Sequence, residues 1–175
     1  LDMQKVQLTS NQLVNDAFAG SPIVSYVSPA ALTRAGGRLF ADCPNLAAVV
    51  WNANVSLGSN TFEGVSNPNL LLYVNSSALN QTTAKNVVVN GTAAKITLSD
   101  ATTGNSNFYC PQAFTAQDIS YTHDYQQETV IGVTQGWETL TLPFNVQTVK
   151  HQSGRTLLPF GADGDGYPFW LMELQ

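Results

Sequence analysis

One histidine lies directly beside a carboxylate, and this pair is the first candidate for acid–base chemistry. His123 and Asp124 are adjacent in the chain, and an imidazole oriented by a carboxylate is a common general base. Both fall in a segment, 119–125, whose residues alternate as in a β-strand. Because neighbouring residues of a strand point to opposite faces, the two side chains cannot act as a base and its orienting partner. The sequence also contains no Gly-rich phosphate loop, no Gly-x-Ser-x-Gly motif and no His-Glu-x-x-His motif, so we predict no catalytic residues and no enzymatic activity.

Two aspartates near the end of the sequence, Asp163 and Asp165, alternate with glycines. Carboxylates in a flexible loop suit hard cations such as Ca²⁺, but the glutamate that closes a twelve-residue calcium loop is missing. A weak calcium site and a Gly-rich turn between strands are therefore both open. We expect the turn, with no bound metal and no cofactor.

The two cysteines, Cys43 and Cys110, permit a single disulfide bond. Pairing requires close Cα atoms and cannot be read from spacing, so a bridge and two free thiols both stay open. Neither cysteine stands at zinc-ligand spacing from His123 or His151.

A repeat organises the first part of the chain. Phe18, Phe40 and Phe62 stand at equal intervals, and each precedes a small polar turn and a short apolar segment. We predict strands at 23–27, 46–51 and 70–74. A fixed period in the twenties with one turn and one strand per unit is typical of a leucine-rich-repeat solenoid. Such units bury their apolar faces only by stacking, so the three phenylalanines should form one buried file.

The pattern Phe-x-x-Cys-x-x-Leu-x-x-Val, preceded by a segment of the type Leu-Gly-x-x-Thr-Phe, resembles the BspA-like leucine-rich repeats of bacterial surface proteins. The middle copy carries the Phe-x-x-Cys-x-x-Leu-x-x-Val core in full, with Phe40, Cys43, Leu46 and Val49, and the Leu-Gly-x-x-Thr-Phe segment is residues 57–62. Segments 107–111 and 136–144 resemble the region that follows these repeats in large surface proteins of gut-dwelling anaerobes. The resemblance implies a secreted protein, or one on the outer face of a bacterial cell, that binds a macromolecule.

The predicted strands are apolar on both faces. If Val49 and Trp51 point into the solenoid, alternation sends a second set of apolar side chains outward: Val27, Val50, Leu72 and Val74. A parallel sheet with two apolar faces is normally covered on both. Either the chain's own C-terminal part covers this ladder, or a partner does, in which case these four residues form a ligand-binding surface.

Beyond residue 76 the pattern changes. Residues 87–98 read as a hairpin around Asn90-Gly91, the strongest short turn signal, and 100–107 is a polar loop. Alternating segments follow at 119–125, 129–133, 137–142 and 146–150. We predict a mainly β chain with a short leucine-rich-repeat solenoid (1–76), a capping hairpin and loop (77–106) and a β-sandwich-like domain (107–175). The apolar final residues lead us to expect that this last domain is truncated.

Composition narrows the functions. The net charge is −5, and the seven Lys and Arg residues are scattered, so we expect no nucleic-acid partner. No apolar run is long enough to span a membrane. The leading hypothesis is an adhesion or recognition module that binds a protein or glycan at the cell surface. A structural spacer and a carbohydrate-binding module are the alternatives, and the oligomeric state stays open.

Overall fold

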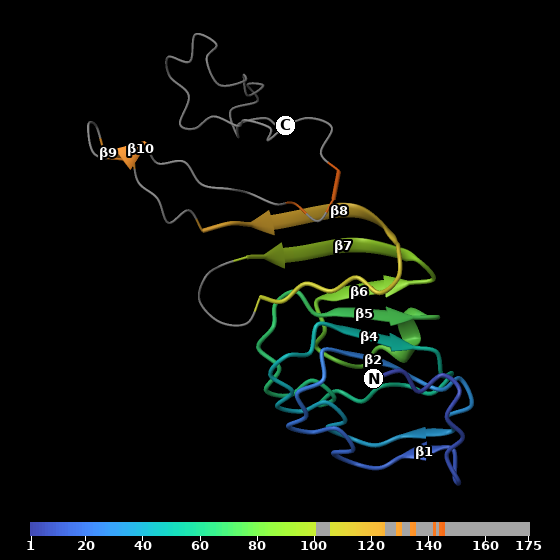
Figure 1. Ribbon diagram of the computed structural model, residues 1–175. Helices are drawn as coiled ribbons and strands as arrows, with labels where there is room; N and C mark the ends of the chain where they lie inside the picture. The colour runs from blue at the N-terminus through green and yellow to red at the C-terminus, as the bar shows by residue number, and fades with distance from the viewer. Residues whose placement is uncertain (101–105, 125–128, 131–133, 136–141, 143, 146–175) are drawn as a thin grey trace. The chain divides into compact units, whose positions relative to one another are not determined.

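The computed structural model describes residues 1–100, 106–124, 129–130, 134–135, 142 and 144–145 (Figure 1). The chain divides into two compact units, Leu1–Glu128 and Thr129–Gln175. In the second unit, the described residues include a short antiparallel pair, β9 (Thr129–Val130) and β10 (Thr134–Gln135). The strand predicted at 146–150 and most of the strand predicted at 137–142 lie outside the described residues, so the β-sandwich-like domain stays a prediction there.

The first unit is built around stacked parallel strands, which confirms a solenoid-like arrangement (Figure 1). The strands are β2 (Ser25–Val27), β4 (Ala48–Trp51), β5 (Leu71–Val74) and β6 (Asn86–Val89). The first three coincide with the strands predicted from the repeat. The offset along the chain from β2 to β4 equals that from β4 to β5, and β6 joins β5 in parallel at a shorter offset.

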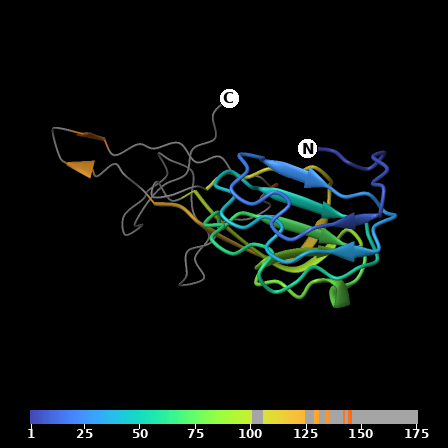
Figure 2. The same ribbon diagram turned by 90° about the horizontal axis from the view of Figure 1, so that it is seen from below.

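On the opposite side of the coils from β2, β4 and β5, two further pairs of segments are bridged in parallel; Figure 2 shows the molecule from below. Strand β1 (Gln12–Leu13) pairs in parallel with β3 (Arg34–Ala35). One coil further on, Leu57 bridges Asn80 in the same sense, next to the short 3₁₀ helix η1 (Ser77–Leu79). Parallel pairing therefore joins neighbouring coils on both sides of the solenoid, at these two places on one side and through β2, β4, β5 and β6 on the other.

The three phenylalanines form the predicted file. The ring centroids of Phe18 and Phe40 are 5.4 Å apart, and those of Phe40 and Phe62 are 5.9 Å apart, with nearly parallel planes in both pairs. Phe40 is fully buried, Phe62 nearly so, and Phe18 partly. They pack in one apolar core with Tyr26 and Trp51 from the strands.

Tight corners allow the coils to stack closely. Gly20, Asp42 and Gly64 recur at the same interval as the phenylalanines, and all three have positive φ, at 68°, 56° and 73°. Glycine adopts this conformation readily and aspartate tolerates it. At another corner, a Cβ on Gly36 would lie 2.3 Å from the backbone carbon of Val14, so this approach between coils requires glycine.

The register between the strands differs from the one that an alignment of the repeat motifs gives. Alignment on the Pro-Asn-Leu segments pairs Val49 with Tyr73, whereas the structure pairs Val49 with Leu72 and Trp51 with Val74. Counted from its phenylalanine, each of β2, β4 and β5 begins one residue later than the strand before it, so each successive corner is longer. A slip of one residue exchanges the two faces of a strand.

A hairpin ends the run of parallel solenoid strands. Strand β6 turns through Asn90 and Gly91 into β7 (Thr92–Ser99). Both turn residues have positive φ, 49° and 76°, as a two-residue type I′ turn requires. This confirms the predicted hairpin. Strand β8 (Thr115–Thr122) then pairs in parallel with β7, at the same offset along the chain as β4 from β2.

Strand β8 belongs to the same sheet as the solenoid strands, whose order is β2-β4-β5-β6-β7-β8. The structure therefore divides the chain differently from the prediction, which placed this strand in a separate domain starting at residue 107. The compact unit runs on to Glu128.

The outer face of the solenoid strands is covered by the chain itself. A second apolar core joins outward side chains of β4, β5 and β6 to side chains of β7 and of the segment that follows. Its buried members are Val50, Leu71, Tyr73, Val88, Ala93, Ile96 and Leu98, with Phe108 and Phe114 packed against them. The chain's own later residues therefore cover the outer face of these strands, which includes Val27 and Val50 of the predicted ladder.

Two buried asparagines hold the cover, which is β7 together with the segment between β7 and β8, against the solenoid strands. The Asn69 side chain, 2% exposed, donates to the backbone oxygens of Ser99 and Ser106 and accepts from the Ser99 amide at 2.7 Å. Asn86, fully buried, donates to Pro68 and accepts from the Thr97 amide. Because buried amides must be paired, these contacts specify where the cover lies.

Candidate functional site

The ladder predicted as a ligand-binding surface is not exposed. Val50, Leu72 and Val74 are 3%, 0% and 3% exposed, and Val27 is partly buried. Val27 and Val50 do face outward, but they pack with the second core, beneath the cover. Leu72 and Val74 point into the solenoid interior because of the one-residue shift in register. The expected exposure of these residues is wrong, and we do not propose a ligand there.

A different surface feature lies where β4, β5 and β6 end. A shallow pocket of about 140 Å³ opens at these strand ends, next to the hairpin turn and to Gln112 of the covering segment. Its lining is Val50, Trp51, Asn52, Tyr73, Val74, Asn75, Val88, Asn90, Gly91 and Gln112. We call it the rim pocket. Its polar side chains are chiefly carboxamides, and none carries a charge at neutral pH.

Three asparagines form a row along the rim pocket. Asn52, Asn75 and Asn90 each follow directly on strands whose last residues, Trp51, Val74 and Val89, are register partners. The Asn52 side chain donates to the backbone oxygen of Ser28 at 3.1 Å, and that of Asn75 to the backbone oxygen of Asn52 at 3.4 Å. The register therefore places three carboxamides, one after each of β4, β5 and β6, at the same edge of the sheet.

These carboxamides retain hydrogen-bonding capacity. In Asn52 and Asn75 the amide nitrogen is engaged with the preceding coil, but the side-chain oxygen accepts no hydrogen bond from the described residues. The side chains of Asn90 and Gln112 make no hydrogen bond to other described residues. The rim pocket thus offers several neutral acceptors and donors to a bound molecule.

Tyr73 holds the segment between β7 and β8 against the rim pocket. Its hydroxyl donates to the backbone oxygen of Gln112 at 2.9 Å, and its ring meets that of Phe114 edge to face at 6.0 Å. Burial, followed by contact with Cys110, raises the pKa of Tyr73. The phenol is therefore neutral at any physiological pH, and it positions Gln112 rather than exchanging protons.

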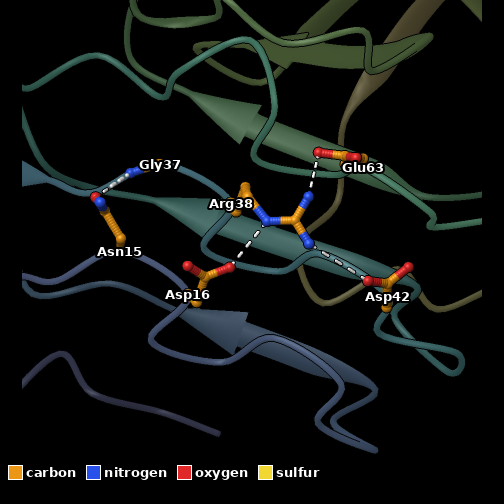
Figure 3. Close-up of polar contacts among 6 residues, drawn as sticks. All are labelled: Asn15, Asp16, Gly37, Arg38, Asp42 and Glu63. Atoms are coloured by element: carbon orange, nitrogen blue, oxygen red, sulfur yellow. Dashed lines mark hydrogen bonds and ion pairs between the residues drawn. The ribbon is translucent and has the colours of Figure 1, made fainter.

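A second polar cluster, shown in Figure 3, links three coils through one arginine. Nε of Arg38 donates to Asp16 of the preceding coil at 2.9 Å, and its other nitrogens pair with Glu63 of the next coil and, at 3.5 Å, with Asp42. Hydrogen bonds to Asp16 and Glu63 raise the pKa of Arg38. All four side chains are well exposed, so this cluster serves to align neighbouring coils.

His123 has a carboxylate partner at the end of the neighbouring strand, Asp100. Nδ1 of His123 lies 2.6 Å from Oδ2 of Asp100. The two residues come directly after the register partners Ser99 and Thr122, so the pairing of β7 with β8 places them side by side. Burial raises the pKa of Asp100, but hydrogen bonds from Tyr121 and His123 outweigh it and lower the pKa. Sequence reasoning missed this pair because it considered only adjacent residues.

Both cysteines are free thiols, so the bridge left open by the sequence is absent between these described residues. Cys43 is buried, and its thiol contacts the backbone oxygen of Phe18 at 3.0 Å. Asp163 and Asp165 lie outside the described residues. In the part of the chain that is described, no group of three potential metal ligands and no helix capable of crossing a membrane is found.

Comparison of the chain with protein-family models, curated proteins and solved structures gives no match. The resemblance to BspA-like repeats therefore stays a prediction from the sequence.

Proposed function

We propose that this chain is a recognition module that binds a macromolecular ligand through the rim pocket, as part of a protein displayed at the surface of a cell. The observation that carries the proposal is the row of carboxamides at successive strand ends, each with a polar atom left for a ligand. A stack of strands that offers the same group at three successive strand ends suits an extended ligand with repeating units.

The lining of the rim pocket favours binding over turnover. General acid–base catalysis uses groups whose pKa lies near the working pH. Tyr73 is the titratable residue of the lining, its pKa is raised, and its hydroxyl is engaged with Gln112. Carboxamides supply orientation and hydrogen bonds, which are what a binding site needs.

A structural spacer is the second candidate. The stacked file of Phe18, Phe40 and Phe62 and the Arg38 cluster both connect neighbouring coils along the solenoid, and such contacts favour a stiff rod. A spacer needs no ligand, so a binding experiment separates the two candidates.

The test is an array of immobilised glycans and extracellular-matrix proteins, probed with the whole chain and with the double variant Asn75→Ala/Gln112→Ala. Both side chains are exposed, so the variant should keep its fold, which circular dichroism verifies. Gln117→Ala is the matched control, because Gln117 is an exposed carboxamide of β8 outside the rim pocket. We expect the chain and the control to bind a ligand that the double variant loses. Absence of binding, or equal binding by all three, would overturn the proposal.

A further inference from the structure

We infer that the ligand of the rim pocket is a neutral glycan, bound through one of its sugar residues. The inference rests on the proposed function and concerns the same site. Its basis is the chemistry of the lining: carboxamides from Asn52, Asn75, Asn90 and Gln112, with no charged side chain among them.

Charge selects against ionic ligands. Anionic groups are held in proteins by arginine, lysine or clustered backbone amides, and cationic groups by carboxylates; the rim pocket has neither kind of side chain. The chain as a whole carries a net charge of −5, which disfavours approach by sialylated or sulfated glycans. A neutral polyhydroxyl compound needs no ionic partner in the rim pocket and is not repelled by the negative charge of the chain.

Hydroxyl groups match the free atoms of the lining. A sugar hydroxyl donates one hydrogen bond and accepts others, so vicinal hydroxyls can pair with the oxygen of one carboxamide and the nitrogen of another. The side-chain oxygens of Asn52 and Asn75 are open acceptors with respect to the described residues, and Asn90 and Gln112 add both donors and acceptors. Successive strands lie roughly 4.8 Å apart, which is close to the scale of one sugar ring.

The small volume of the rim pocket and the burial of its aromatic side chains limit which part of a ligand can bind there. The volume of about 140 Å³ is below the roughly 300–1,000 Å³ of sites for drug-sized ligands, so it accommodates one small unit while the rest of a chain stays outside. Trp51 and Tyr73 are 1% and 5% exposed and offer little surface on which a ring could stack. Recognition therefore depends on the carboxamides, and affinity for a single site should be modest.

The experiment measures binding of the whole chain to three sets of probes on one array: neutral glycans, sialylated and sulfated glycans, and matrix proteins before and after enzymatic removal of their glycans. For any neutral glycan that binds, the free oligosaccharide is titrated as a competitor at low and at high NaCl concentration. We expect neutral glycans to bind, affinity to change less than about threefold with salt because no charges are paired, and Asn75→Ala/Gln112→Ala to weaken binding at least about tenfold. Gln117→Ala should bind as the unaltered chain does.

The experiment distinguishes failure of the neutral-glycan inference from failure of the proposed recognition function. Binding only to charged glycans, or only to matrix proteins regardless of their glycans, with loss in the double variant, would overturn the neutral-glycan inference and leave the recognition function standing. Binding to none of the probes would overturn both. Binding to neutral glycans that the double variant retains would overturn the assignment to the rim pocket.

Discussion

The rings of Phe18 and Phe40 lie stacked, with their centroids 5.4 Å apart and their planes inclined by 10°. Phe40 is fully buried between Phe18 and Phe62, whereas Phe18 at the end of the file is partly exposed. We expect Phe40→Ala to lower the free energy of unfolding by about 3–5 kcal/mol, because it removes a ring from a packed core. Phe18→Ala should cost less. Urea unfolding followed by circular dichroism measures the free energy of unfolding of both variants. Equal decreases in the two variants would contradict the stacking of the three phenylalanines.

The close approach of Gly36 to Val14 gives a second prediction. A methyl group at Gly36 would lie 2.3 Å from backbone atoms, so neighbouring coils must separate. We expect Gly36→Ala to destabilise the chain by about 2 kcal/mol or more. Gly58→Ala is the control, since a Cβ there meets no atom within 4 Å, and its effect should stay within about 0.5 kcal/mol. Similar unfolding midpoints for the two variants would show that the coils do not pack as described.

Two tyrosines should respond in opposite directions to loss of their hydroxyls. The Tyr26 hydroxyl is buried without a hydrogen-bond partner among the described residues, and burial raises the pKa of Tyr26. An unpaired buried hydroxyl is costly, so Tyr26→Phe should be neutral or stabilising by about 1 kcal/mol. Tyr73→Phe loses the bond to Gln112 and should destabilise by about 1 kcal/mol. Thermal melts of the two variants test the contrast, which a destabilised Tyr26→Phe would refute.

The Asp100 carboxylate predicts a dependence of stability on pH. Burial acts to raise its pKa, but hydrogen bonds from Tyr121 and His123 outweigh burial and hold the folded pKa below the usual value. The stabilisation is therefore present above the usual pKa, near 4, and is lost as the pH falls through the folded pKa. At pH 7, Asp100→Asn should cost under about 1 kcal/mol, since the side chain is 37% exposed. The difference between the variant and the unaltered chain should shrink below about pH 4; a constant difference down to pH 2 would contradict this.

The repeat made much of the fold predictable. Phenylalanines at a fixed spacing indicated the file, and Asn90-Gly91 indicated the hairpin; both are present. The register was not predictable from motif alignment, because the corner before each strand gains one residue per coil, and this gain moves Leu72 and Val74 from the outer face to the interior. Burial on both faces removes the polar alternation that would otherwise have fixed the register.

The candidate site was less predictable than the fold. Asn52, Asn75 and Asn90 are unremarkable in a chain rich in asparagine, and they align only once the unequal offsets between β4, β5 and β6 are known. Gln112 joins them through the cover, which depends on Tyr73 and on the buried side chain of Asn69. The pairing of Asp100 with His123 was hidden in the same way, because it follows from the register of β7 and β8.

The most direct test of the central claim, that the rim pocket is the recognition surface, is nuclear magnetic resonance of side-chain amide groups. In ¹H–¹⁵N spectra the NH₂ resonances of Asn75, Asn90 and Gln112, assigned by single substitutions, are followed while a ligand from the array is added. We predict that these resonances shift with saturation while that of Gln117 on β8 stays in place. Shifts at Gln117 with none at Asn75 and Gln112 would contradict the account.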